Sequence, residues 1–169
     1  MADVLLTPAV ITSLYRSHGD QVWRRARSIL RNDDDARDLV QEVFMWLLKN
    51  PGAFRGESAP STYLYAATTR AALTRLRDSR NRARLLDERV IAADVHPSHE
   101  GLSVDERADL RALMAKLPEH VAEVVVYSFI DGMSHDEIAK LLNITRREVA
   151  ARLDRVPALA RHLQSKGVA

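Results

Sequence analysis

The 169-residue chain carries 25 Lys and Arg against 23 Asp and Glu, a formal net charge of +2, and contains no cysteine. This length suits one ordinary domain or two small ones. The lack of cysteine excludes disulfides, a thiol nucleophile and cysteine-ligated zinc, and favours the cytoplasm. Residues 1–10 do not resemble a signal peptide, and no apolar run approaches the roughly 18 residues of a membrane span. We therefore expect a soluble, cytoplasmic protein without membrane insertion.

Charge is unevenly distributed along the chain. Acidic residues gather in residues 33–42 and 87–109, and arginines gather in residues 70–84 and 146–161. One charged stretch is usually a solvated helix face, but two arginine-rich stretches favour binding to a polyanion.

Apolar residues recur at helical spacing, and no segment alternates as a strand does. The predicted fold class is all-α. Thr7 and Pro8 are typical of a helix start, and Gly19 with Asp20 predicts a break before a second helix.

A turn at residues 32–34 predicts a third helix that runs to Lys49. Its apolar arc includes Met45 and Trp46, and we expect most of this arc to be core. Residues 51–59 predict a loop, after which Pro60 starts a long helix.

Residues 87–102, which include His96 and His99, are acidic and poor in apolar periodicity, and they predict a flexible linker between domains 1–86 and 103–169. Ser103 to Glu106 forms a capping-box pattern that starts the next helix. Pro118 then separates this helix from another that ends near residues 131–132.

Two further capping-box patterns, Ser134 to Glu137 and Thr145 to Glu148, are separated by Asn143 and Ile144 alone. Helices joined by so short a turn cross steeply, which predicts a helix-turn-helix. The second helix turns Val149, Leu153 and Val156 inward. Its outward residues are Arg146, Arg147, Ala150, Ala151, Arg152 and Arg155, and the arginines among them are hydrogen-bond donors suited to guanine edges and phosphates. DNA binding is favoured over a plain three-helix bundle with a solvated basic face.

Three segments of the chain resemble the signature of extracytoplasmic-function (ECF) sigma factors of bacterial RNA polymerase. These are DARDLVQEVF at residues 35–44, FRGESAPSTYLY at residues 54–65, and LPEHVAEVVVYSFIDGMSHDEIAKLLNITRREVAARL at residues 117–153. Their order, with a linker before the third segment, makes the resemblance specific and extends it over nearly the whole chain.

The resemblance implies a promoter-specificity subunit that is not an enzyme and needs no cofactor or metal. Its partners would be core RNA polymerase and promoter DNA, with an anti-sigma factor left open. The implied core polymerase-binding residues are Asp38, Leu39, Gln41, Glu42 and Phe44. The implied residues for the minus-ten element, where a base is flipped from the duplex, are Arg55, Gly56, Glu57, Ser58, Ser61, Tyr63, Arg70, Arg75 and Arg77. Those for the minus-thirty-five element are Thr145, Arg146, Arg147, Glu148, Ala150, Arg152 and Arg155.

The chain departs from the family pattern at a few positions, which leaves the promoter sequence and the efficiency of melting open. Tyr63 stands where tryptophan is usual, Ala66 and Arg70 replace a common arginine and asparagine, and Ala150 replaces a lysine. Pro157 predicts a kink or a helix end near Val156.

The sequence also contains features of two other functional classes. Asp34, Asp35 and Asp38 spell DDxxD, a magnesium–diphosphate motif of helical terpenoid synthases, but the domain is too short to enclose a prenyl chain and aspartates at a helix start explain the same pattern. His96 and His99 are interpreted as surface residues. A stand-alone helix-turn-helix regulator is the remaining alternative, and polymerase binding separates it from a sigma factor.

Overall fold

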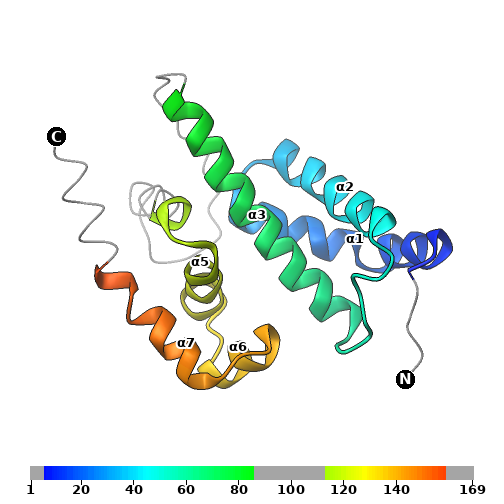
Figure 1. Ribbon diagram of the computed structural model, residues 1–169. Helices are drawn as coiled ribbons and strands as arrows, with labels where there is room; N and C mark the ends of the chain where they lie inside the picture. The colour runs from blue at the N-terminus through cyan, green and yellow to red at the C-terminus, as the bar shows by residue number, and fades with distance from the viewer. Residues whose placement is uncertain (1–5, 86–112, 159–169) are drawn as a thin grey trace. The chain divides into compact units, whose positions relative to one another are not determined.

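The computed structural model describes residues 6–85 and 113–158, and the regular structure of these residues is entirely helical (Figure 1). In chain order the elements are α1 (Pro8–Leu30), α2 (Asp33–Lys49), α3 (Pro60–Leu85), α5 (Glu119–Val125), the π-helix η1 (Val126–Ile130), α6 (His135–Leu142) and α7 (Arg146–Leu153). The all-α prediction is confirmed. None of the described helices is both long and apolar enough to span a bilayer.

The chain packs into two compact units that divide between Ala72 and Leu73, within α3. The predicted linker 87–102, the domain limits at its two ends, the Ser103 to Glu106 capping box and both linker histidines lie outside the described residues.

Helix α1 is continuous through Gly19, so the predicted break at Gly19 and Asp20 is wrong. An interior glycine costs a helix about 1 kcal/mol relative to alanine. Several of the residues that follow, including Val22 and Ile29, are buried, and burial of one such side chain contributes roughly 1.5–3 kcal/mol. Tertiary packing therefore outweighs the local preference for a break.

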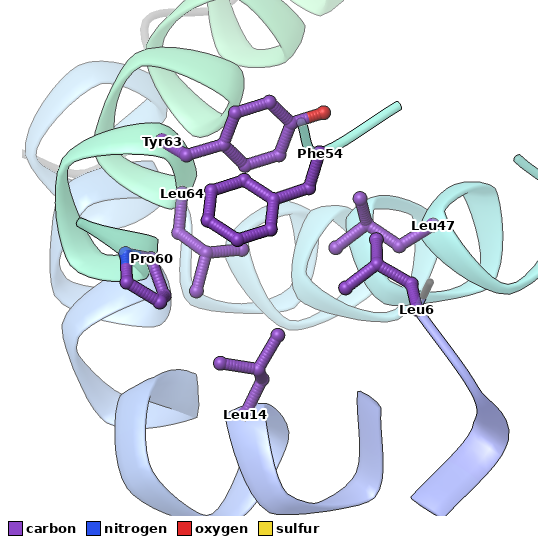
Figure 2. Close-up of a pocket in the computed structure, with 7 residues that line it drawn as sticks. All are labelled: Leu6, Leu14, Leu47, Phe54, Pro60, Tyr63 and Leu64. Carbon is purple, nitrogen blue, oxygen red and sulfur yellow. The ribbon is translucent and has the colours of Figure 1, made fainter. Parts of the chain in front are cut away.

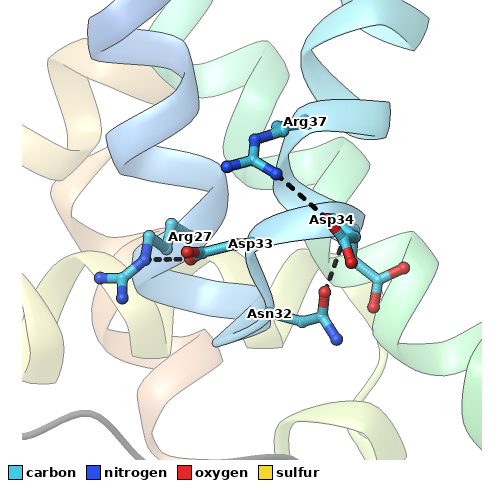
Figure 3. Close-up of polar contacts among 6 residues, drawn as sticks. Arg27, Asn32, Asp33, Asp34 and Arg37 are labelled. Atoms are coloured by element: carbon cyan, nitrogen blue, oxygen red, sulfur yellow. Dashed lines mark hydrogen bonds and ion pairs between the residues drawn. The ribbon is translucent and has the colours of Figure 1, made fainter.

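Helix α2 begins as predicted, at a cap formed by Asn32, whose side chain accepts a hydrogen bond of 2.9 Å from the amide of Asp35. Arg27 of α1 pairs with Asp33, and Arg37 pairs with Asp34 at 3.2 Å (Figure 3). Negative charge in a first turn also complements the helix dipole. These acids are therefore accounted for as helix-start residues.

Helices α1 and α2 lie side by side and bury their apolar faces against each other (Figure 1). The buried residues of α2 are Ala36, Leu39, Val40, Val43, Phe44 and Leu47. Phe44 also meets the exposed Tyr15 of α1 edge-on, with ring centroids 5.2 Å apart. The opposite side of α2 is left for solvent or for a partner.

A buried arginine attaches α3 to α1. Arg25 is 6% exposed, and its Nε donates to Oγ1 of Thr69 at 2.9 Å. Its guanidinium also lies over the ring of Tyr65, 4.2 Å from the centroid, as a cation–π contact. Because Tyr65 and Thr69 lie on one side of α3, this contact determines which residues of the helix turn outward.

In the second unit, α5 passes into the π-helix η1, in which the amide of Asp131 bonds to the carbonyl of Val126 at 3.1 Å. The wider π turn changes the direction in which the side chains after it point. Tyr127 is fully buried, whereas Phe129 is 70% exposed.

Candidate functional site

The helix-turn-helix predicted from paired capping boxes is present. Ser134 and Glu137 start α6, with the Ser134 amide donating to Glu137 Oε2 at 2.8 Å and the Glu137 amide donating to Ser134 Oγ at 3.3 Å. Thr145 and Glu148 repeat this exchange at α7, at 2.8 and 3.2 Å. Between the helices, Asn143 takes the left-handed conformation with φ 52°, and its amide bonds to the carbonyl of Ala139.

Apolar contacts fix the inner side of this motif. Ile138 of α6 and Val149 of α7 are both fully buried, and α7 packs on α5 and α6. Leu153 and Val156 are half-buried. The inward stripe predicted for α7 is therefore present, and its opposite side faces solvent.

The exposed side of α7 begins with Arg146 and Arg147 in its first turn, directly after the exposed cap Thr145. Ala150 is half-buried, and no long side chain stands there. Glu148, in contrast, is engaged as a cap. The backbone and hydroxyl hydrogen bonds from Thr145 hold the pKa of its carboxyl below the ordinary value of 4.5.

Arg152 and Arg155 stand at the other end of the helix. Arg152 is half-buried, and its Nη1 lies 3.5 Å from the carbonyl oxygen of His120 in α5. Arg155 is exposed in a turn that follows Leu153, the last residue of α7. The break predicted near Val156 thus comes slightly earlier, because the ring of Pro157 clashes with the carbonyl four residues before it.

The loop predicted at residues 51–59 joins α2 to α3, and Arg55, Gly56, Glu57 and Ser58 are all exposed in it. Gly56 has φ 72°, a left-handed conformation that favours glycine. Residues 56–58 therefore form a bend that stands out from the helices.

An apolar cluster holds both ends of this loop (Figure 2). Its members are Leu6, Leu14, Leu47, Phe54, Pro60, Tyr63 and Leu64. Phe54, at the loop's first half, is 7% exposed and meets the ring of Tyr63 at a centroid distance of 5.2 Å. The amide of Leu6 also bonds to the carbonyl of Pro51 at 3.3 Å. The cluster thereby fixes where the exposed bend begins and ends.

Tyr63 and Arg70, two of the residues expected to contact the minus-ten element, lie on one face of α3. Tyr63 and Arg70 are seven residues apart, which is close to two full turns. Burial raises the pKa of the Tyr63 hydroxyl, and the positive charge of Arg70 opposes this rise. Arg77 continues the same line by a further seven residues, whereas Arg75 is rotated about 140° from Arg70. Ser61, in the first turn, is half-buried.

The outer face of α2 carries Asp38, Gln41 and Glu42, all exposed. Leu39 and Phe44, which were predicted beside them, are only 1% and 5% exposed, so they support this face from the core.

Most of the apolar arc of α2 is core, as predicted, but Met45 and Trp46 are exceptions, because each is 51% exposed. The apolar arc of α2 is wider than its neighbouring helices cover. Met45 follows Asp38 and Glu42 at helical spacing, so it extends their face with an apolar side chain.

Within residues 6–85 and 113–158, no group of three or more His, Asp or Glu side chains is placed to hold a metal ion. The aspartates of the DDxxD pattern lie in the first two turns of α2, where Asp34 pairs with Arg37.

Comparison with known proteins identifies the family of the chain. The Sigma-70 region 2 model matches residues 14–82, and the Sigma-70 region 4 model matches residues 107–156. The chain is 35% identical over 153 residues to the ECF RNA polymerase sigma factor SigE of Mycolicibacterium smegmatis, with 84% of this chain and 56% of that protein covered. It thus spans little more than half of that relative. SigM of Mycobacterium tuberculosis is 32% identical over 153 residues, which cover 89% of this chain and 75% of SigM.

A solved structure shares the fold. The sigma factor RpoE of Bartonella quintana, in complex with the anti-sigma factor NepR, matches 91% of this chain and 96% of its own with a TM-score of 0.53 and 17% identity. Two sigma regions in the expected order, together with relatives of this similarity, show that the chain belongs to the ECF family of RNA polymerase sigma factors.

Proposed function

We propose that this sigma factor binds core RNA polymerase through α2, reads a minus-thirty-five element with α7, and helps to open the minus-ten element with the loop between α2 and α3. One observation carries the proposal: region 2 and region 4 occur in a single chain, and each presents an exposed surface of suitable chemistry. A regulator that acts without polymerase would not need region 2, so the stand-alone alternative is not favoured.

The polymerase-binding surface consists of Asp38, Gln41, Glu42 and Met45, with Leu39 and Phe44 supporting it from below. Acidic, polar and apolar side chains share one exposed helix face there. Such a mixture suits a protein interface, in which apolar contact supplies affinity and charge supplies orientation.

The minus-ten surface consists of Arg55, Gly56, Glu57, Ser58 and Ser61, with Tyr63 and three arginines of α3. Extrusion of a base costs a few kcal/mol, which contacts to the extruded base and to the backbone can offset. The loop offers exposed polar groups for the base, and Arg70 and Arg77 form one line of positive charge for the backbone. Arg75 would contact DNA from another side of α3.

The minus-thirty-five surface is the N-terminal half of α7. Arg146 and Arg147 project from the first turn, the part of a recognition helix that meets base edges. Thr145 and Glu148 hold this turn in shape, and Ala150 permits a close approach to the groove. Arg152 and Arg155 lie further along the helix axis and would meet phosphates.

As a sigma factor, the chain would have no catalytic activity of its own and would act in the cytoplasm together with the polymerase. An anti-sigma factor is a further expected partner, because the similar protein of Bartonella quintana is seen bound to one.

The test is reconstitution. Purified protein is added to core polymerase that lacks any sigma factor, and transcripts made from genomic DNA are sequenced. We expect a small set of defined start sites that share two upstream elements. Specific DNA binding without core binding or defined transcripts would instead indicate the stand-alone regulator.

A further inference from the structure

We propose that Asp136 is a specificity-determining residue that orients Arg146 for base reading. The inference rests on the role proposed above for α7. Nη1 of Arg146 lies 3.6 Å from Oδ2 of Asp136, so an ion pair connects the first turn of the recognition helix to the first turn of α6.

The two capping boxes explain why these two side chains meet. Each box fixes the start of its helix, and left-handed Asn143 folds α7 back sharply after α6. Glu137 is already bonded to Ser134 through its carboxylate. Asp136 is therefore the first-turn carboxylate of α6 that pairs with α7.

The exposure of the pair indicates what it does. The side chains of Arg146 and Asp136 are 70% and 64% exposed, and ion pairs so accessible to water contribute little to folding stability. Their effect is on the orientation of the long arginine side chain, which has many rotamers. A carboxylate on one side of the planar guanidinium limits those rotamers and leaves the other N–H donors available for a guanine edge.

Arg147 provides an internal comparison. It is exposed next to Arg146 in the same turn, and in the described part of the chain no acidic side chain forms an ion pair with it. If an acidic neighbour orients a recognition arginine, removal of Asp136 changes the contribution of Arg146 and not that of Arg147.

The experiment is a double-mutant cycle on the reconstituted holoenzyme. Asp136→Asn, Arg146→Ala and the double variant are compared for binding to a promoter found by transcript sequencing and to its single-base variants in the minus-thirty-five element. We expect Arg146→Ala to reduce discrimination at one base pair roughly tenfold. Asp136→Asn should reduce discrimination at that same base pair about threefold, the order expected for an exposed pair. The double variant should match Arg146→Ala.

Asp154→Asn is the matched control, because it removes an exposed negative charge from the other end of α7. It should change binding to all sequences equally. If Asp136→Asn behaves in the same way, or if its loss adds fully to that of Arg146→Ala, Asp136 does not orient Arg146 and the inference is wrong. Unchanged discrimination in Arg146→Ala is a distinct result, which would overturn the base-reading role of Arg146 itself.

Discussion

Gly56 is the residue at which the exposed loop between α2 and α3 takes a left-handed backbone conformation, with φ 72°. A side chain in this conformation costs roughly 1–2 kcal/mol. We expect Gly56→Ala to distort the loop and to reduce promoter opening more than binding to closed promoter DNA. Permanganate reactivity of promoter thymines measures opening, and fluorescence anisotropy measures binding.

Gly52→Ala in the same loop is the control. A Cβ at Gly52 meets no atom within 4 Å, and its backbone does not need glycine. Equal opening defects in the two variants would mean that loop shape at Gly56 is irrelevant to melting.

Arg25 is a second residue whose substitution we expect to lower the free energy of unfolding substantially. Arg25→Met removes a buried charged hydrogen bond to Thr69, a loss of about 1.5–3 kcal/mol in the free energy of unfolding. Arg25→Lys should recover only part of it, because an ammonium does not stack on Tyr65 as a planar guanidinium does. Chemical denaturation followed by tryptophan fluorescence reports on the unit that contains Arg25. Both tryptophans, Trp23 and Trp46, lie in α1 and α2 of that unit.

The neighbouring Arg24 supplies the comparison for Arg25. It forms an exposed ion pair with Asp20, and Arg24→Met should change stability by less than about 1 kcal/mol. Similar losses for Arg24 and Arg25 would show that the buried contact does not hold α3.

At the scale of the element, the outer face of α2 combines charge with exposed apolar surface. Reversal of Asp38 and Glu42 to lysine should weaken binding to core polymerase roughly tenfold or more while helicity stays unchanged, because charged groups at an interface fix its register. Surface plasmon resonance and circular dichroism measure the two quantities. Asp20→Lys reverses an exposed acid on α1 and should bind as the unaltered chain does. If the double variant binds core polymerase with the same affinity as the unaltered chain, this face of α2 is not part of the interface.

The stability of the first turn of α7 should depend on pH through the carboxyl group of Glu148. Because hydrogen bonds from Thr145 lower the pKa of Glu148 in the folded state, its contribution to stability is fully present above the unfolded value of about 4.5. This contribution is lost as the pH falls through the lower, folded value. Glu148→Gln keeps a side-chain acceptor for the capping box but does not titrate.

Amide hydrogen exchange in the first turn of α7 measures this effect. Between about pH 5 and pH 3, protection in Glu148→Gln should decrease less than in the unaltered chain, after correction for the intrinsic exchange rate. Glu57→Gln removes an exposed carboxylate from the loop and serves as the control. The same pH profile in all three proteins would exclude Glu148 as the titrating group.

At the scale of the whole molecule, the features that could be predicted from sequence are those that depend on neighbouring residues. The capping boxes at Ser134 and Thr145 join side chains to backbone three residues away, and left-handed Asn143 follows from its own short polar side chain. The start of α3 at Pro60 is equally local.

The features that could not be predicted depend on what covers each element. Periodicity gives the width of the apolar arc of α2 but not the extent of its neighbours, so the exposure of Met45 and Trp46 was missed. Arg25 looks like any other charged residue of α1 until α3 is packed against it. The contact of Asp136 with Arg146 likewise needs the crossing of α6 and α7. Such contacts can be predicted from the sequence only when the helix that packs against the residue is already known.

The proposed surfaces lie in different parts of one chain and act on one promoter, so their energetic contributions should be separable. Mutations at distant sites without shared contacts add within about 0.5 kcal/mol. We therefore expect Arg147→Ala to weaken closed-complex formation and Gly56→Ala to weaken opening, with the double variant showing both losses in full. A coupling well above that limit would mean that base reading by α7 and strand opening at the loop are not independent steps. Initial binding and the later appearance of reactive thymines, followed on the same promoter at one salt concentration, distinguish these outcomes.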